Sequence, residues 1–174
     1  MKRFTLLLTA LLLCAGGMSL RAETITHGFN TMNKDKTIVF NMDFTEGATD
    51  LVTYTCHNCE FGPTASSSQV SIRLVDKNDY VVISPALNNL KSLYMVCETS
   101  VEPKSLLRVY VSEDGSTWSD ALTGAETPMA GAMRIAIPEG YYYLKIANSK
   151  STAIYIRSIA YEFDNCPSCY SYDY

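Results

Sequence analysis

Apolar and polar positions alternate in this chain with a period close to two over most of its length. Such alternation is typical of β-strands with one buried face. We expect strands over residues 37–42, 51–55, 70–74, 80–83, 93–97, 107–111, 133–137, 141–146 and 153–163. No segment keeps apolar residues three and four positions apart for long enough to predict a helix.

Two polar segments between these strands are predicted to be hairpin turns. Residues 76–79 are Asp-Lys-Asn-Asp, and residues 112–118 are Ser-Glu-Asp-Gly-Ser-Thr-Trp. Asp and Asn bond their own backbone and Gly adopts positive φ, which tight turns require. Nine or ten short strands in one domain predict an all-β fold, because a single open sheet of that size would leave one face uncovered. The expected architecture is a two-sheet antiparallel sandwich.

The order of three stretches resembles a known class of modules. The stretches are VVISPALNNLKSLYMVCET, LLRVYVSEDGSTWSDAL and MRIAIPEGYYYLKIANSKSTAIYIRSIAYEF, within residues 70–163. They resemble the jelly-roll modules of secreted bacterial proteins that belong to the broad galactose-binding-like or carbohydrate-binding-module class. The resemblance consists of strand order and hairpin type. It implies a sandwich of jelly-roll type and, in many members, a role in glycan binding.

The first 22 residues are expected to form a signal peptide. Lys2 and Arg3 precede an apolar run over 4–14, and small residues lead to a cleavage site after Ala22. The run is too short to span a membrane. We therefore expect an exported, secreted protein. Cys14 follows three leucines in a sequence loosely similar to a bacterial lipobox, so lipidation at this cysteine is the alternative to simple cleavage.

Domain boundaries and charge follow from that leader. Residues 23–163 are expected to form the β-sandwich domain and residues 164–174 a cysteine-containing tail. Removing 22 of 174 residues and 3 of 14 basic residues leaves 11 basic and 18 acidic side chains, a net charge of −7. This charge argues against nucleic acid as a partner and against an anionic membrane surface. No second apolar run has the length of a transmembrane segment.

Cysteine is the sharpest local signal. Cys56 and Cys59 form one Cys-x-x-Cys pair, and Cys166 and Cys169 form another. Export favours disulfides, and pairs crossed between the two motifs would attach the tail to the domain, with a stabilisation of about 4 to 5 kcal/mol for a loop of roughly 100 residues. Four thiolates could instead hold zinc, or act as redox thiols. Cys97 alternates in phase with its apolar neighbours and is expected to be a buried thiol.

Aromatic and basic residues share the outward positions of the late strands. Tyr142, Leu144 and Ile146 are expected to point inward, as are Ile154 and Ile156. If the strands are neighbours, one sheet face presents rings beside cations, on which sugars stack. The predicted ligand-binding residues are Tyr141, Tyr143, Lys145, Tyr155 and Arg157, and Arg108 with Tyr110 repeats the pattern. The alternative is that such Tyr–Lys and Tyr–Arg pairs only stabilise a solvated face.

Three further residue types complete the expectations about chemistry. Trp118, the only tryptophan, is expected to pack in the core. The carboxylates of residues 76–79 and of Glu113 and Asp114 could hold structural calcium, but turn chemistry explains them without an ion. We therefore expect no cofactor. His27 and His57 lie far apart, and no catalytic motif accompanies them.

These observations predict an exported, non-catalytic binding module whose partner is a glycan or surface polysaccharide. One alternative is a structural or assembly protein of the cell envelope that binds a protein partner. The other is a zinc or thiol site built from the two Cys-x-x-Cys pairs.

Overall fold

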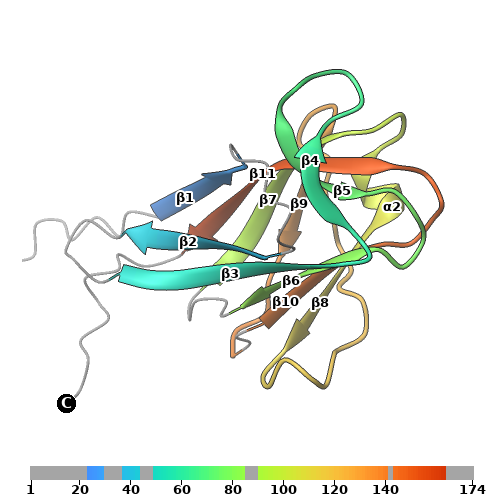
Figure 1. The fold of residues 1–174 in the computed structure, drawn as a ribbon. Coiled ribbons are helices and arrows are strands. Elements are labelled where there is room, and N and C mark those ends of the chain that lie inside the picture. The colour runs from blue at the N-terminus through green and yellow to red at the C-terminus, as the bar shows by residue number, and fades with distance from the viewer. Residues whose placement is uncertain (1–22, 30–36, 44–48, 85–89, 141–142, 164–174) are drawn as a thin grey trace, which may run out of the picture.

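The computed structural model describes residues 23–29, 37–43, 49–84, 90–140 and 143–163, which form eleven strands and one short helix (Figure 1). The elements are β1 (Glu23–Gly28), β2 (Thr37–Asp43), β3 (Thr49–His57), β4 (Glu60–Pro63), β5 (Val70–Leu74), β6 (Tyr80–Ser84), β7 (Leu90–Glu98), α2 (Pro103–Leu106), β8 (Leu107–Ser112), β9 (Ala132–Ala136), β10 (Tyr143–Asn148) and β11 (Ile154–Phe163). Among these residues no helix has the length and apolar character needed to cross a membrane.

The strands form two antiparallel sheets. The first sheet has the order β4-β5-β11-β7-β9, with β1 also paired to β11, and the second has the order β2-β3-β6-β10-β8. In Figure 1 the first sheet lies above the second. From β5 to β11 every successive strand belongs to the opposite sheet. This alternation is that of a jelly roll, so the predicted two-sheet sandwich of jelly-roll type is confirmed.

Strand β11 organises the first sheet. One of its edges pairs with β7 along most of its ten residues. The other edge is shared, because residues 154–156 pair with β5 and residues 158–163 pair with β1. A single long strand therefore holds three neighbours.

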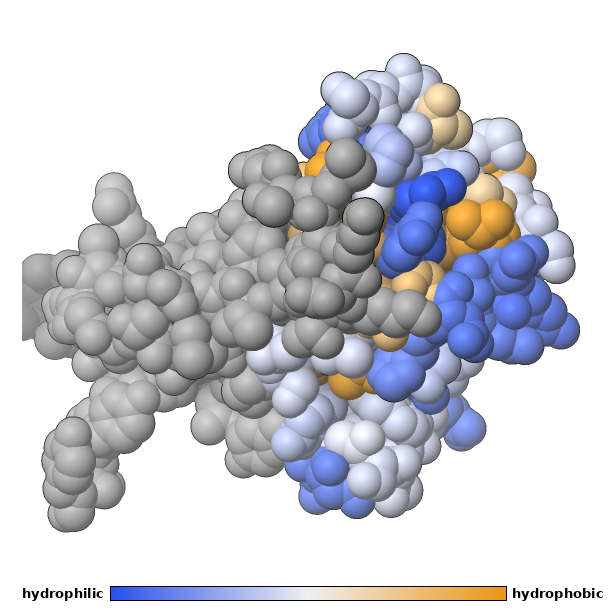
Figure 2. All heavy atoms as spheres, viewed as in Figure 1, coloured by the Kyte–Doolittle hydropathy of each residue, from blue (hydrophilic) through white to orange (hydrophobic). Residues whose placement is uncertain are grey.

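The core lies between the two sheets. Every second residue of β6 and β10 is buried, as is expected when one face of a strand is covered. Ile83, Leu144 and Ile146 from the second sheet are fully buried, as are Leu93 and Ile159 from the first. The face of the molecule shown in Figure 2 is mostly hydrophilic over its described part, with hydrophobic residues in small separate areas. The apolar side chains of the described residues are thus mostly buried in the core.

All nine predicted strands are present, with ends that differ by up to three residues. Two strands, β1 and β4, and the four-residue helix α2 were not predicted. The predicted hairpin at residues 76–79 is wrong, because β5 and β6 belong to different sheets. The Asp79 carboxylate accepts hydrogen bonds from the backbone N–H groups of Val75 and Asp76. This turn chemistry reverses the chain wherever it occurs, and does not reveal whether the next strand stays in the same sheet.

The second predicted hairpin is present as a turn but lacks a second strand. After the turn the backbone N–H groups of Ser119 and Leu122 donate to the carbonyls of Val111 and Val109 in β8. The returning segment therefore covers the free edge of β8, the outermost strand of the second sheet.

Candidate functional site

The outer face of the second sheet carries the candidate site. Strand β10 directs Leu144 and Ile146 into the core, and the alternating residues Tyr143 and Lys145 outward, where both are half-buried. The register places Lys145 opposite Val82 of β6 on one side and opposite Tyr110 of β8 on the other. Lys145 therefore lies in the middle of the sheet face.

Three aromatic rings surround the Lys145 ammonium group. Its Nζ lies 4.5 Å from the ring centroid of Tyr110, 4.6 Å from that of Trp118 and 5.9 Å from that of Tyr80. We call these four residues the aromatic–lysine cluster. Its rings come from β6, β8 and the turn after β8, and all three are half-buried, so part of each ring faces solvent. All three distances lie within the range of cation–π attraction.

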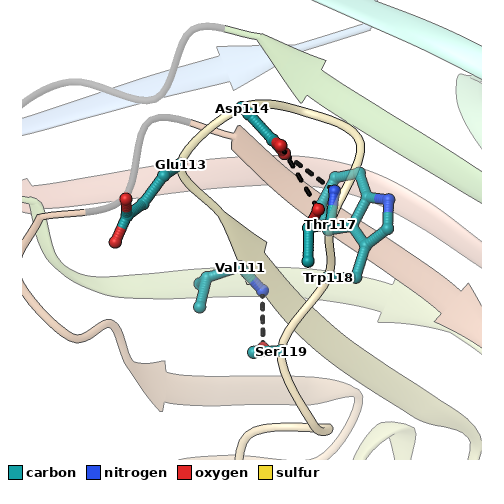
Figure 3. A pocket seen from close by; sticks show the side chains of 6 residues that line it. All are labelled: Val111, Glu113, Asp114, Thr117, Trp118 and Ser119. Atoms are coloured by element: carbon teal, nitrogen blue, oxygen red, sulfur yellow. Dashed lines mark hydrogen bonds between the residues drawn. The ribbon is translucent and has the colours of Figure 1, made fainter.

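The turn over residues 112–118 brings Trp118 to this face. The Asp114 carboxylate accepts backbone hydrogen bonds of 2.7 Å from both Ser116 and Thr117. Figure 3 shows its contacts with Thr117. These donors lower the pKa of Asp114 to about 2. The expectation that Trp118 packs in the core is wrong, because its ring lies half-buried against Lys145. Because these hydrogen bonds fix the turn, the Trp118 ring lies on the outer face of the second sheet.

Gly115 fits the turn against Tyr143. Its φ is +73°, a backbone conformation that residues with a side chain rarely adopt. A Cβ at this position would lie 3.1 Å from ring atoms of Tyr143. The absence of a side chain therefore lets the turn lie directly on the Tyr143 ring, which places this predicted residue beside the aromatic–lysine cluster.

A cleft of about 390 Å³ opens beside Trp118 at the β8 edge of the sheet. It is lined by Val111, Glu113, Asp114, Thr117, Trp118 and Ser119. Figure 3 shows Glu113 and Trp118 on opposite sides of the turn, with Glu113 directed away from the indole. The cleft thus extends the ring surface toward the edge of the molecule.

His57 extends the aromatic surface in the other direction. It pairs with Tyr80 across β3 and β6, and the two rings stack with centroids 4.5 Å apart and planes 9° apart. His57 is exposed. The face therefore presents a row of rings from β3 to the turn beyond β8.

Electrostatics distinguishes Lys145 within this row. Among the described residues no carboxylate forms an ion pair with it. Partial burial lowers its pKa, because the charged ammonium loses some of its hydration. The ring faces compensate only in part for that loss.

The structure does not bring the five predicted ligand-binding residues together. Tyr143 and Lys145 lie on the second sheet, whereas Tyr155 and Arg157 point outward from β11 in the first sheet. The prediction of one shared face is therefore wrong, and Tyr141 lies outside the described residues. Alternation gives the side of a strand on which a residue lies, but the connection from β10 to β11 crosses between the sheets. Arg108 and Tyr110, in contrast, do share the face of Lys145.

Sequence reasoning missed Tyr80 and gave Trp118 the wrong role. The signal for Tyr80 was present, because it alternates with the buried Val81 and Ile83 and must point outward. Its proximity to Lys145 depends on β6 pairing with β10, which local pattern does not show.

The outer face of the first sheet is a network of paired charges. Arg73 forms an ion pair with Glu60, and Arg134 with Glu162 at 2.7 Å. Arg157 Nε donates to the Gln69 side chain at 2.8 Å. Each of these three cations therefore has a hydrogen-bond acceptor. Such cross-strand pairs stabilise a sheet face that is exposed to solvent.

A second cleft, of about 320 Å³, opens on the first sheet. It is lined by Lys91, Ser92, Gly124, Glu126, Arg134, Ala136 and Glu162. Arg134 stacks over Tyr94 at 5.5 Å from the ring centroid while it pairs with Glu162. Arg134, one of the two cations that line this cleft, thus has a carboxylate partner, unlike Lys145.

The three described cysteines, Cys56, Cys59 and Cys97, are buried. Cys56 and Cys59 are not bonded to each other, and the Cys59 Sγ–H donates to the Tyr80 carbonyl at 3.1 Å. Cys166 and Cys169 lie outside the described residues, so crossed disulfides and a shared zinc site stay predictions. Within the described ranges no group of three or more potential metal ligands is found.

The prediction for Cys97 is confirmed. It is 6% exposed, and burial raises the pKa of its thiol to about 12. Calcium at the two turns stays an alternative to the expected absence of a cofactor. The structure shows the carboxylates of Asp79 and Asp114 bound to backbone N–H groups, which turn chemistry alone explains.

No family model and no curated protein matches the chain. Several solved structures are similar to it. The K1 cleaved adhesin domain of Lys-gingipain from Porphyromonas gingivalis W83 is 15% identical, with 80% of this chain and 97% of that domain covered and a TM-score of 0.40. The xylan-binding module CBM86 from Roseburia intestinalis is 9% identical (81% and 96% covered, TM-score 0.44), and the xylan-binding module CBM15 is 14% identical (83% and 99% covered, TM-score 0.44).

The matched structures include carbohydrate-binding modules and adhesin domains, and carbohydrate-binding modules form the class that the sequence resembles. At these low TM-scores, the fold rests on the chain's own strand pairing, and the site on its own side chains.

Proposed function

We propose that this protein is a non-catalytic binding module that holds a glycan on the outer face of its second sheet. The observation that carries the proposal is the aromatic–lysine cluster, in which three half-exposed rings surround one ammonium group. The predicted signal peptide supports a ligand outside the cell. A protein partner of the cell envelope stays a prediction.

The chemistry of the face suits a sugar. A pyranose ring has apolar faces of C–H groups and a rim of hydroxyls. The rings of Tyr110 and Trp118 offer flat apolar area, Lys145 offers an ammonium group beside them, and His57 offers a polar ring next to Tyr80. Aromatic area supplies affinity in such sites, and a few polar groups set orientation.

Electrophoresis of the protein through gels that contain single polysaccharides tests the proposal. We expect Tyr110→Ala and Trp118→Ala to weaken binding to the retarding polysaccharide at least about tenfold, because each removes stacking area at the centre of the site. Tyr155→Ala is the matched control, since it removes a half-buried tyrosine from the outer face of the other sheet. Thermal unfolding of each variant verifies that it folds.

Retardation that is equal for the wild type and both ring variants would place binding elsewhere. Loss on Tyr155→Ala alone would move the site to the first sheet. A wild-type protein that no polysaccharide in a broad panel retards would contradict glycan binding itself.

A further inference from the structure

We propose that the glycan is acidic, and that a carboxylate or sulfate on a bound sugar pairs with the Lys145 ammonium group. This inference rests on the proposed function and specifies its ligand class. The net charge of −7 expected for residues 23–174 does not prevent such a contact, because charges more than about 8 Å apart are largely screened at physiological ionic strength, whereas a direct ion pair is not.

The two outer faces differ in how their cations are paired. On the first sheet, Arg73 and Arg134 have carboxylate partners, and Arg157 has the Gln69 side chain. On the second sheet, Lys145 contacts rings and has no carboxylate partner among the described residues. Lys145 thus lies at the centre of a sheet face, and no carboxylate in the described part of the protein compensates its charge.

The two acidic residues in the turn that carries Trp118 do not pair with Lys145. Both oxygens of the Asp114 carboxylate are occupied by donors of the turn, from Ser112, Ser116 and Thr117. Glu113 is exposed and points away from Trp118 (Figure 3). Arg108, the other cation of this face, donates to the backbone carbonyls of Lys104 and Leu107 instead.

The Lys145 ammonium group also lacks strong hydrogen-bond acceptors in its ring surroundings. An ammonium group has three N–H donors, and ring faces are weak acceptors that do not satisfy them. Partial burial strengthens any charge-assisted hydrogen bond formed there, because less water competes for the donors. An anionic group would therefore gain more at Lys145 than a neutral hydroxyl would.

The position of the ammonium group lets one sugar contact it and the rings together. Lys145 Nζ lies over the faces of two rings, within 4.6 Å of the centroids of Tyr110 and Trp118. An anionic substituent that pairs with Nζ is therefore held close to both rings, and the sugar that carries it can contact their solvent-facing parts.

The test uses polysaccharide pairs that differ only in charge. One pair is polygalacturonate and its methyl ester, and the other is a sulfated galactan and the same galactan after desulfation. We expect wild-type protein to bind the anionic member of at least one pair at least about tenfold more tightly, a preference of the size that one charge-assisted contact supplies. Which pair responds identifies carboxylate or sulfate as the recognised group.

Variants of Lys145 connect the preference to this residue. Lys145→Gln should abolish the preference for the anionic member, Lys145→Arg should retain part of it, and added salt should reduce it in the wild type. Equal binding of both members by the wild type, or an unchanged preference in Lys145→Gln, would overturn the inference.

Tyr110→Ala separates this inference from the proposed function. If Tyr110→Ala weakens binding to both members while Lys145→Gln changes nothing, the site binds glycans without recognising charge, and only the acidic ligand is refuted. If neither variant affects binding to any polysaccharide of the broad panel, or if no polysaccharide of that panel binds, the proposed function fails as well.

Discussion

At the scale of single residues, Gly115 shows how one missing side chain shapes the candidate site. Its positive φ is common to Gly124, Gly131 and Gly140, so the backbone conformation alone does not distinguish it. What distinguishes it from Gly124 and Gly140 is a close neighbour, because a Cβ would lie 3.1 Å from the Tyr143 ring. The sequence Asp-Gly predicted a turn at this point, but only the fold reveals that the turn lies on an aromatic ring.

We therefore expect Gly115→Ala to destabilise the protein by about 2 to 3 kcal/mol, since it adds a steric contact to the cost of a positive φ. Gly124→Ala is the control, because its φ is +79° and no atom lies within 4 Å of its Cβ position. That control should cost only about 1 kcal/mol. Urea denaturation measures both values, and equal losses would show that the Tyr143 contact is unimportant.

At the scale of elements, strand alternation determines which residues pack in the core and which lie on an outer face, where they can contact a ligand. Along β11, Ile154 and Ile156 are fully buried, and the intervening Tyr155 is half-buried on the outer face. The same alternation along β10 separates Leu144 from Lys145. Sequence reasoning predicted both assignments correctly, because the period of a strand is a local property of the chain.

Neighbouring substitutions in β11 should differ accordingly. We expect Ile156→Ala to lower the free energy of unfolding by about 2 to 5 kcal/mol, because it removes buried methyl and methylene groups and leaves a cavity. Tyr155→Ala should cost about 1 kcal/mol or less, because it loses only surface contacts such as the one with Arg73.

Chemical denaturation of both variants at neutral pH tests this difference. A larger loss for Tyr155→Ala than for Ile156→Ala would contradict the observed orientation of the strand.

At the scale of the whole molecule, a pair of tyrosines joins the two sheets. Tyr54 of β3 and Tyr161 of β11 are 0% exposed, and their hydroxyl oxygens lie 2.5 Å apart. Burial raises the pKa of both phenols above the usual 10.0, because a phenolate would lose its hydration in the core. The pair lies 107 positions apart in the chain, so no local pattern could have predicted it.

These pKa values predict a loss of stability at high pH. The unfolded chain releases the two protons near pH 10, whereas the folded chain retains them, so rising pH above about 10 favours the unfolded state. Below that pH both states hold the two protons, so the contribution of the tyrosine pair to the free energy of unfolding is fully present. Unfolding free energies measured at pH 8, 9.5 and 10.5 should therefore fall steeply over the last interval.

The double variant Tyr54→Phe with Tyr161→Phe provides the control. It removes both buried ionisable groups, and its stability should decline less between pH 9.5 and 10.5 than that of the wild type. Parallel declines in the two proteins would show that other groups cause the alkaline loss.

The sequence by itself determined the all-β class, the positions of nine strands and the inward or outward direction of Leu144, Lys145, Ile154, Tyr155 and Ile156. These properties depend on alternation and turn chemistry, which act over a few residues. The tertiary structure alone decided which strands share a sheet. Sheet membership depends on how crossovers between layers bury the whole core, and no short segment carries that information. For this reason Tyr155 and Arg157 lie on the face opposite Lys145, while Tyr80, Tyr110 and Trp118 meet around it.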